Sequence, residues 1–198
     1  KDIQKCALQM LRDQLGYPVH PVHRLDRKTG GILLFGKSRE ALTLISNEFQ
    51  SRRVQKSYLA IVRGLTNNKG VIDYPLKNES GKIQEAITYY KAVSKTELNF
   101  PSARYVTSRY SLVRLFPYTG RMHQLRKHMA HIMHPIVADR PYGWNKQNKI
   151  FKEKFNLMTM LLHAETLIFF WKGEIVEIRA NPQAEFKRML SVLKLSYD

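Results

Sequence analysis

A lone carboxylate among permanent cations is the first feature of this chain that suggests chemistry. Residues 22–31 read Val-His-Arg-Leu-Asp-Arg-Lys-Thr-Gly-Gly, so Asp26 is flanked by Arg24, Arg27 and Lys28. Nearby positive charge favours the ionised form of a carboxylic acid, and paired glycines let the backbone approach a ligand closely. An ionised carboxylate beside cations that can hold phosphates indicates chemistry on nucleic acid. The alternative is a solvated basic turn with Asp in its ordinary turn role.

A second unusual segment, residues 119–131, is rich in long hydrogen-bond donors, and we expect a helix from 121 to 134. Such donors fix the register of a polyanion, because most contacts with nucleic acid are made to phosphate and sugar. The predicted phosphate-facing side chains are Arg121, His123, Gln124 and Lys127. Arg126 follows Leu125 of the apolar stripe, so we expect it to be partly buried and to need an anion. Asp26 is an attractive partner, but sequence alone does not establish the contact.

Three histidines make a metal site the rival reading of this helix. His128, His131 and His134 are spaced three apart, but no cysteine is near and the closest acid is Asp139. Zinc on a helix usually takes an i, i+4 pair or a set mixed with Cys or carboxylate. The surrounding Arg and Lys side chains would also repel a dication. We therefore predict no metal here, although a metal-dependent hydrolase stays an alternative.

The charge of the chain points to a polyanionic partner. Its 198 residues carry 33 Lys plus Arg against 16 Asp plus Glu, a net charge of +17. Such a field attracts nucleic acid, and the spread of the basic residues along the chain indicates a charged face on a folded body. Cys6 is the single cysteine, which excludes an internal disulfide and predicts a reducing, cytoplasmic setting. No apolar run reaches the ~18 residues of a membrane span.

The expected elements indicate an α+β protein with a mixed, largely antiparallel sheet flanked by helices. Helices and strands alternate without a regular βαβ rhythm. We expect helices over 3–15, 38–52, 121–134 and 183–193, with a helical piece in 140–156. We expect strands over 32–35, 58–62, 71–76, 86–93 and 104–116, and a hairpin of 161–170 with 174–179.

The chemistry-bearing motifs resemble, in order, those of the RluA-type family of pseudouridine synthases, which isomerise uridine in RNA. Together the five blocks are highly specific. They are His23-Arg24-Leu25-Asp26 with Thr29-x-Gly31, Lys56-x-Tyr58-x-Ala60-x-Val62-x-Gly64, Thr119-Gly120-Arg121-x-His123-Gln124-Leu125-Arg126-x-His128, His134-Pro135-Ile136-x-x-Asp139 and Leu161-Leu162-His163-Ala164. The likeness is strongest to members that modify tRNA, on the Ser108-Arg109-Tyr110 run, the Arg-rich helix and the Gln147-Asn148-Lys149-x-Phe151 loop.

The resemblance implies a role for each matched residue. Asp26 is expected to be the catalytic aspartate, Tyr58 to pack on the target base and take its proton, and Arg126 to pair with the catalytic carboxylate. Arg24 is expected to enter the RNA helix where the target base leaves it, and Leu162 to form part of the apolar pocket wall. The reaction breaks the bond between ribose C1′ and uracil N1 and joins C1′ to C5. It implies no cofactor, no metal and no ATP.

Two departures from the family pattern stand out. Gly30 occupies a position where the family usually has Ser, which we expect to alter the stiffness of the loop. Residues 1–21 contain no match to the family's upstream Lys-Pro-x-Gly segment, and no S4-like domain is recognisable. We therefore expect residues 1–198 to be one pseudouridine synthase domain that lacks this segment.

The sequence predicts an RNA pseudouridine synthase that flips a specific uridine to a catalytic aspartate. We expect tRNA as its partner, with ribosomal RNA as the alternative substrate. We expect no membrane association and no obligate protein partner. A non-catalytic RNA-binding module with the same basic face is the alternative from another class.

Overall fold

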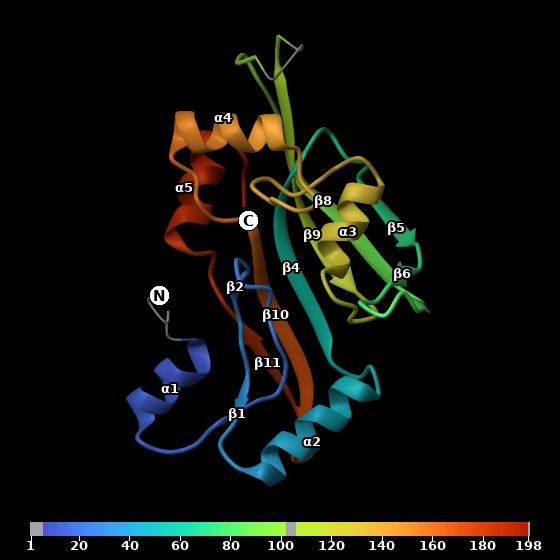
Figure 1. The fold of residues 1–198 in the computed structure, drawn as a ribbon, viewed down its shortest axis with the longest axis vertical. Helices are drawn as coiled ribbons and strands as arrows, with labels where there is room; N and C mark the ends of the chain where they lie inside the picture. Colours follow the sequence, from blue (N-terminus) through green and yellow to red (C-terminus); the bar gives the residue numbers. More distant parts are fainter. Residues whose placement is uncertain (1–5, 102–105, 198) are drawn as a thin grey trace.

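A long antiparallel sheet runs the length of the molecule (Figure 1). The computed structural model describes residues 6–101 and 106–197. The strands follow the order β11-β10-β4-β9-β8-β5, and β2 pairs in parallel with β10. They are β2 (Gly30–Gly31), β4 (Gln55–Arg63), β5 (Lys69–Asp73), β8 (Ile87–Leu98), β9 (Ser108–Pro117), β10 (Leu162–Trp171) and β11 (Glu174–Arg179). The predicted α+β class is confirmed.

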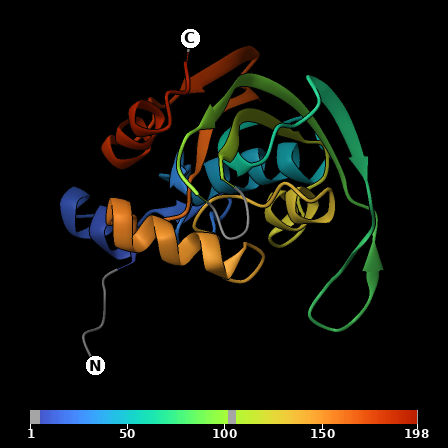
Figure 2. The same ribbon diagram turned by 90° about the horizontal axis from the view of Figure 1, so that it is seen from above.

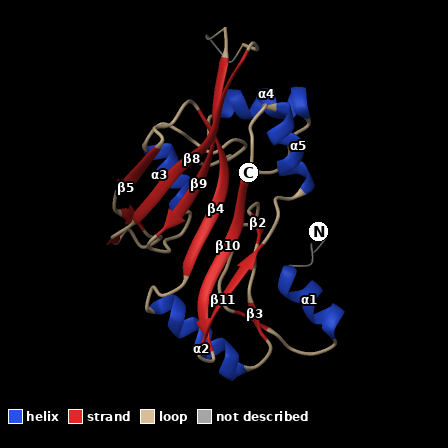
Figure 3. Cartoon of the chain, turned by 180° about the vertical axis from the view of Figure 1, so that it is seen from behind, coloured by secondary structure: helices blue, strands red, loops and turns tan. Residues whose placement is uncertain are grey.

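Five helices and two small ribbons surround this sheet in the described part of the chain. The helices are α1 (Ala7–Leu15), α2 (Arg39–Gln50), α3 (Gln124–His131), α4 (Asn145–Phe155) and α5 (Ala184–Val192). The ribbons pair β1 (His20–Pro21) with β3 (Phe35–Gly36) and β6 (Leu76–Lys77) with β7 (Ile83–Gln84). In Figure 2 the sheet is curved, with α3 on its concave side. Figure 3 views the molecule from behind, and there the strands lie in front of α3. Within 6–101 and 106–197, no helix is long and apolar enough to cross a bilayer.

Strand β4 lies between two apolar cores because its side chains alternate between the faces of the sheet. Leu59 and Ile61 pack with residues of α4 and α5 on one face. Ala60 and Val62 pack with residues of α3 on the other face, and Tyr58 joins them there. Side chains at even positions of β4 are therefore directed to the α3 side.

Strand β10 holds two partners along one edge. Strand β11 pairs antiparallel with residues 166–171, and β2 pairs in parallel with His163 and Ala164. The two stretches are separated by Glu165, where pairing of β10 with β4 is also irregular. The buried Glu165 carboxylate accepts two hydrogen bonds from Arg114, at 2.7 and 2.8 Å. This pair stabilises the irregular point and lets β2 take over the edge that β11 leaves.

Helix α3 begins three residues later than the predicted helix over 121–134. The side chain of Gln124 folds back on the preceding turn, where its Oε1 accepts hydrogen bonds from the Thr119 hydroxyl (2.7 Å) and the Arg121 amide (3.0 Å). His123 has a left-handed φ of 55°, which a helix cannot contain. The turn before Gln124 is thus stabilised by side-chain contacts that helical periodicity does not reveal.

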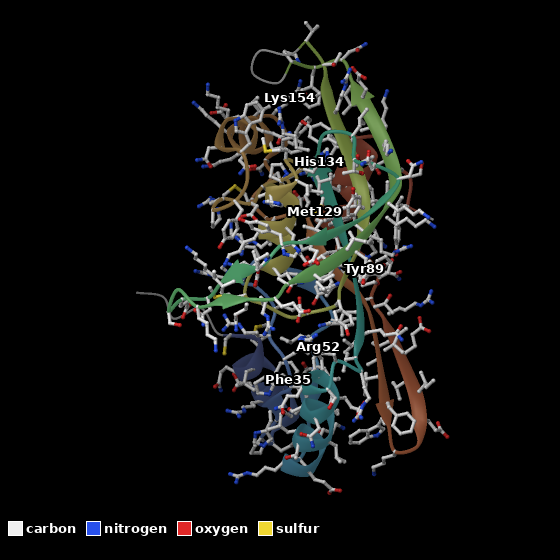
Figure 4. All side chains as sticks on the ribbon, turned by 90° about the vertical axis from the view of Figure 1, so that its right-hand side faces the viewer. Phe35, Arg52, Tyr89, Met129, His134 and Lys154 are labelled. Carbon is white, nitrogen blue, oxygen red and sulfur yellow. The ribbon has the colours of Figure 1, made fainter. Side chains whose placement is uncertain are left out.

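The same helix ends at His131, before the predicted end. Met133 has a left-handed φ of 64°, so the chain leaves the helix ahead of the proline that sequence marks as its end. Figure 4 labels Met129 of this helix and His134 beyond it, with Arg52 lying farther towards the other end of the molecule. Met129 is fully buried and fixes the helix against the sheet.

The predicted buried strand over 32–35 is wrong, because only its last residue pairs, in β3. The Leu34 amide donates to Nε2 of His23 (3.1 Å), and the Ile32 amide donates to the Ala164 carbonyl (3.1 Å). The amides of Leu34 and Ile32 are therefore satisfied by a histidine ring nitrogen and one β10 carbonyl, and not by regular pairing with a neighbouring strand.

The other predictions agree more closely with the structure. The expected strand over 71–76 is divided between β5 and β6, because Pro75 has no amide hydrogen to donate. The predicted helix over 38–52 is confirmed as α2, and the Ser38 hydroxyl caps it by accepting a hydrogen bond from the Ala41 amide (3.1 Å). The long pair β8–β9 and the hairpin β10–β11 are confirmed as antiparallel. Residues 3–5 and 104–105 of the predictions lie outside the described residues.

Candidate active site

A cavity of about 660 Å³ opens between the basic turn (residues 22–31), strand β4, the turn at 117–123 and helix α3. This volume lies in the ordinary range of ligand pockets. The sequence-predicted residues that line it are Arg24, Asp26, Tyr58, Arg121, His123, Gln124, Arg126 and Leu162. Three other predicted residues, Arg27, Lys28 and Lys127, lie outside the lining.

Arg126 joins two carboxylates from opposite sides. Its Nη1 donates to Oδ2 of Asp26 at 2.9 Å. Its Nε and Nη2 donate to the two oxygens of Asp139 at 2.8 and 2.9 Å. The contact between Asp26 and Arg126 that sequence suggested is therefore present. Asp139 was not among the predicted site residues, although it is the first acid after Arg126 and ends one of the family's motif blocks.

The two carboxylates differ in their access to the cavity. The Asp139 side chain is 1% exposed and the Asp26 side chain 22%. Burial lowers the pKa of Arg126, but its hydrogen bonds to Asp139 and Asp26 outweigh that effect and raise it above its usual value. The guanidinium therefore keeps its charge between the two carboxylates. Asp139 holds Arg126 from the buried side, and Arg126 aims Asp26 into the cavity.

His123 lies near the other oxygen of the Asp26 carboxylate. Its Nε2 is 3.8 Å from Oδ1 of Asp26, and its Nδ1 is 3.0 Å from the Tyr142 hydroxyl. Burial lowers the pKa of His123, and the opposing effect of Asp26 is smaller. His123 is therefore neutral at pH 7, and it contributes polarity to this side of the cavity without a second full charge.

Tyr58 faces the same cavity from strand β4. Burial raises the pKa of Tyr58 to about 12, with a further contribution from the charge of Asp26. Its hydroxyl is thus protonated at neutral pH in the free protein. Leu162 of β10 is 4% exposed and lines the cavity with it. The aromatic ring and the leucine together offer an apolar surface beside the carboxylate.

The loop that carries Asp26 is held by a close backbone contact with β10. Gly31 has a φ of 103° and pairs with Ala164, and a Cβ at Gly31 would lie 2.1 Å from the Ala164 carbonyl oxygen. No other residue fits this approach. A Cβ at Gly30 would meet the Gln183 side chain at 2.4 Å, so Gln183 occupies the space beside this departure from the family pattern.

His23 connects the loop to the segment that follows it. Its Nε2 accepts the Leu34 amide, which fixes the hydrogen on Nδ1, and its ring stacks on Phe49 at 5.2 Å between centroids. Burial lowers the pKa of His23, so the acceptor nitrogen stays available at neutral pH. Sequence analysis treated His23 only as part of a motif, because its partner is a backbone amide.

The remaining predicted contact residues fall into two groups. Gln124 is 4% exposed and its amide nitrogen donates to the Ile87 carbonyl (3.0 Å), so it stabilises the turn and the expectation that it faces phosphates is not supported. Lys127 and Lys28 are near the surface, where each donates to a backbone carbonyl. Arg24 is exposed at the cavity.

The three histidines that could have formed a metal site, His128, His131 and His134, each contact different partners. His128 is buried, with ring nitrogens 2.9 Å from the Thr88 hydroxyl and 3.0 Å from the Tyr74 carbonyl. His131 stacks on Tyr74, and His134 lies 2.8 Å from the Arg63 carbonyl. In the part of the chain that the structure describes, no group of three His, Cys, Asp or Glu side chains is arranged to hold a metal ion.

Comparison with known families decides what kind of site this is. The sequence model described as RNA pseudouridylate synthase matches residues 4–131. The chain belongs to this family. The resemblance inferred from the five motif blocks is confirmed, and the pseudouridylate synthase is thus an isomerase that converts uridine to pseudouridine in RNA. The roles of individual site residues stay predictions.

Individual relatives support the same assignment. The tRNA pseudouridine synthase C of Pasteurella multocida is 49% identical over 174 residues, which cover 82% of this chain and 72% of the relative. That of Haemophilus influenzae is 46% identical over 198 residues, which cover 93% of this chain and 83% of the relative. The structure of Human RNA Pseudouridylate Synthase Domain Containing 4 matches with a TM-score of 0.75 and 25% identity, covering 96% of this chain and 81% of that one.

Proposed function

We propose that this pseudouridylate synthase modifies a specific uridine of tRNA, with Asp26 as the catalytic carboxylate. The observation that carries the proposal is the Asp26 carboxylate, held by Arg126 at 2.9 Å in a cavity that Tyr58 and Leu162 also line. The preference for tRNA is supported by relatives 40–49% identical to this chain that are named tRNA pseudouridine synthase C.

The reaction places distinct demands on these side chains. The C1′–N1 bond breaks, the base turns, and a C1′–C5 bond forms; a proton leaves C5 and N1 gains one, so no atom is added or lost. Asp26 acts at the sugar, either as the nucleophile at C1′ or as the base that takes the C2′ proton. Arg126 positions it. The Tyr58 ring packs on the uracil, and Tyr58 can take a proton only after passing its own to another group.

Access to the uridine requires base flipping. A uridine inside a stem must leave the stack, at a cost of a few kcal/mol. Arg24 is exposed at the cavity, in a position to fill the vacated space, and the net charge of +17 attracts the phosphates. Binding should therefore weaken steeply as salt rises. Affinity that stays constant between low and moderate salt would contradict this view.

The test is pseudouridine mapping by carbodiimide-dependent stops on unmodified tRNA and ribosomal RNA. Wild type should form one new pseudouridine in tRNA, and Asp26→Asn should bind the same RNA and form none. Asp73→Asn, at an exposed aspartate of β5, is the matched control and should be active. Product in ribosomal RNA alone would replace the substrate. Binding without product in either RNA would favour a non-catalytic RNA-binding module.

The motif resemblance also carries the remaining proposals. We propose that residues 1–198 act as one catalytic domain in the cytoplasm, without a metal, a cofactor or an obligate protein partner. We expect a chelator to leave the turnover of the purified protein unchanged. Activity that returns only when a metal ion is added would contradict it.

A further inference from the structure

Lys56 shares the cavity with Tyr58 but has no role in the chemistry described above. The two residues are two positions apart on β4, so their side chains leave the same face of the sheet, with Cα atoms about 6.6 Å apart. Both line the cavity. The Lys56 Nζ lies 6.0 Å from the centre of the Phe49 ring and 3.8 Å from where a Cβ on Gly120 would be. The ammonium therefore lies between the Phe49 ring and the backbone of Gly120, which has no side chain.

The surroundings of this ammonium leave its charge uncompensated. Within residues 6–101 and 106–197, the Lys56 ammonium makes no hydrogen bond or ion pair. Burial lowers the pKa of Lys56, as expected where desolvation is not offset by a carboxylate. A partly buried charge without a partner is costly. An anion beside the Lys56 ammonium would offset this cost.

The charge of Arg126, which also lines the cavity, is already satisfied. Arg126 is neutralised by the carboxylates of Asp26 and Asp139, so it adds little attraction for a further anion. RNA supplies anions only as backbone phosphates. In RNA, one sugar separates a backbone phosphate from its base. Lys56 is likewise a short step from Tyr58, two residues away on β4. A carbonyl of the uracil would be neutral and would leave the ammonium without a counter-charge.

We propose that Lys56 binds a phosphate of the RNA backbone next to the flipped uridine. The proposal rests on the proposed function for the position of the uridine, but not for the presence of the anion site. Lysine suits this role because its compact ammonium binds phosphate as a point charge. The contact would hold the backbone while the base turns in the cavity.

The salt dependence of RNA binding tests the charge contact. Each phosphate contact that is lost lowers the slope of log K against log salt by about 0.7 to 0.9. Lys56→Gln should show this decrease, and Lys56→Arg should keep the wild-type slope. Lys187→Gln is the matched control, because Lys187 is an exposed residue of α5, which packs on the other face of the sheet. Equal slopes for Lys56→Gln and wild type would overturn the proposal, even if affinity fell equally at all salt concentrations.

A modified RNA identifies the phosphate itself. A single neutral methylphosphonate on one side of the mapped uridine should weaken wild-type binding and leave Lys56→Gln binding unchanged. Equal weakening of both proteins at each flanking position would overturn the proposal. The salt comparison needs no turnover, so it reports on Lys56 even if no pseudouridine is found. If thermal melting shows that the Lys56→Gln protein is unfolded, Lys56→Met replaces it, because methionine is also a long unbranched side chain without a charge.

Discussion

Replacing the buried Asp139 by asparagine separates positioning from direct chemistry. The substitution keeps the shape of the side chain but removes its charge. Asn can accept one of the two hydrogen bonds that Arg126 now donates at 2.8 and 2.9 Å. Breaking a buried ion pair costs about 3–5 kcal/mol, and one retained hydrogen bond to a charged group recovers about 1.5 kcal/mol or more. We therefore expect Asp139→Asn to lower the free energy of unfolding by about 1.5–3.5 kcal/mol, which leaves a domain of ordinary stability folded.

The effect on turnover should be larger than the effect on binding. With Asp139 neutral, Arg126 is drawn towards Asp26, and a displacement of about 1 Å at a reacting group costs about 10²-fold in rate. The Asp139 side chain is 1% exposed and does not line the cavity, so RNA affinity should change less than threefold. Single-turnover pseudouridine formation, filter binding and urea unfolding measure the three quantities.

A matched control and two outcomes test whether Asp139 positions Arg126. Asp73→Asn removes the same charge from an exposed position of β5 and should leave rate and stability within experimental error. A fully stable Asp139→Asn protein with wild-type single-turnover rate would show that the buried carboxylate does not hold the arginine in place. A loss of RNA binding equal to the loss of rate would show that Asp139 acts on binding and not on positioning.

Three further predictions concern the surroundings of the cavity. Tyr58→Phe keeps the ring and should change RNA affinity less than threefold while turnover falls by about 10²-fold or more; equal losses in both would leave Tyr58 only a stacking surface. Gly31→Ala should lower the urea midpoint strongly, because its Cβ would lie 2.1 Å from the Ala164 carbonyl oxygen; an unchanged midpoint would contradict the close approach. Burial lowers the pKa of His128, so its unfolded state binds a proton first, and the free energy of unfolding should fall as pH drops below 6.5 by up to about 1.4 kcal/mol per pH unit. His128→Gln should flatten this dependence in urea unfolding between pH 7.5 and 5, and a slope equal to that of wild type would refute it.

Local signals made much of the fold predictable. Ser38 caps α2 and Gly16 ends α1 because cap residues act on the neighbouring backbone alone. The turn at 172–173 defines the hairpin β10–β11 in the same way. The contact of Asp26 with Arg126 was suggested because a partly buried arginine requires an anion.

The features that sequence missed depend on distant partners. The segment 32–35 reads as a strand, but its amides are satisfied by the His23 ring and by β10. Helix α3 starts at Gln124 because of a side chain that folds back, not because of periodicity. Asp139 and Lys56 stand in two of the motif blocks, but the sequence does not show their surroundings: Asp139 is buried against Arg126, and the Lys56 ammonium lies in the cavity without a counter-charge.

The two-residue parallel ladder between β2 and β10 has a consequence for the order in which the protein folds. Gly30 and Gly31 pair with His163 and Ala164, which follow them by more than 130 residues. Contacts between residues so far apart in the chain form late, because a long loop must close before they gain anything. During synthesis the basic turn leaves the ribosome early, but Asp26 cannot be fixed until β10 has emerged. An incomplete chain would then attract RNA through its charge while lacking an organised reaction centre.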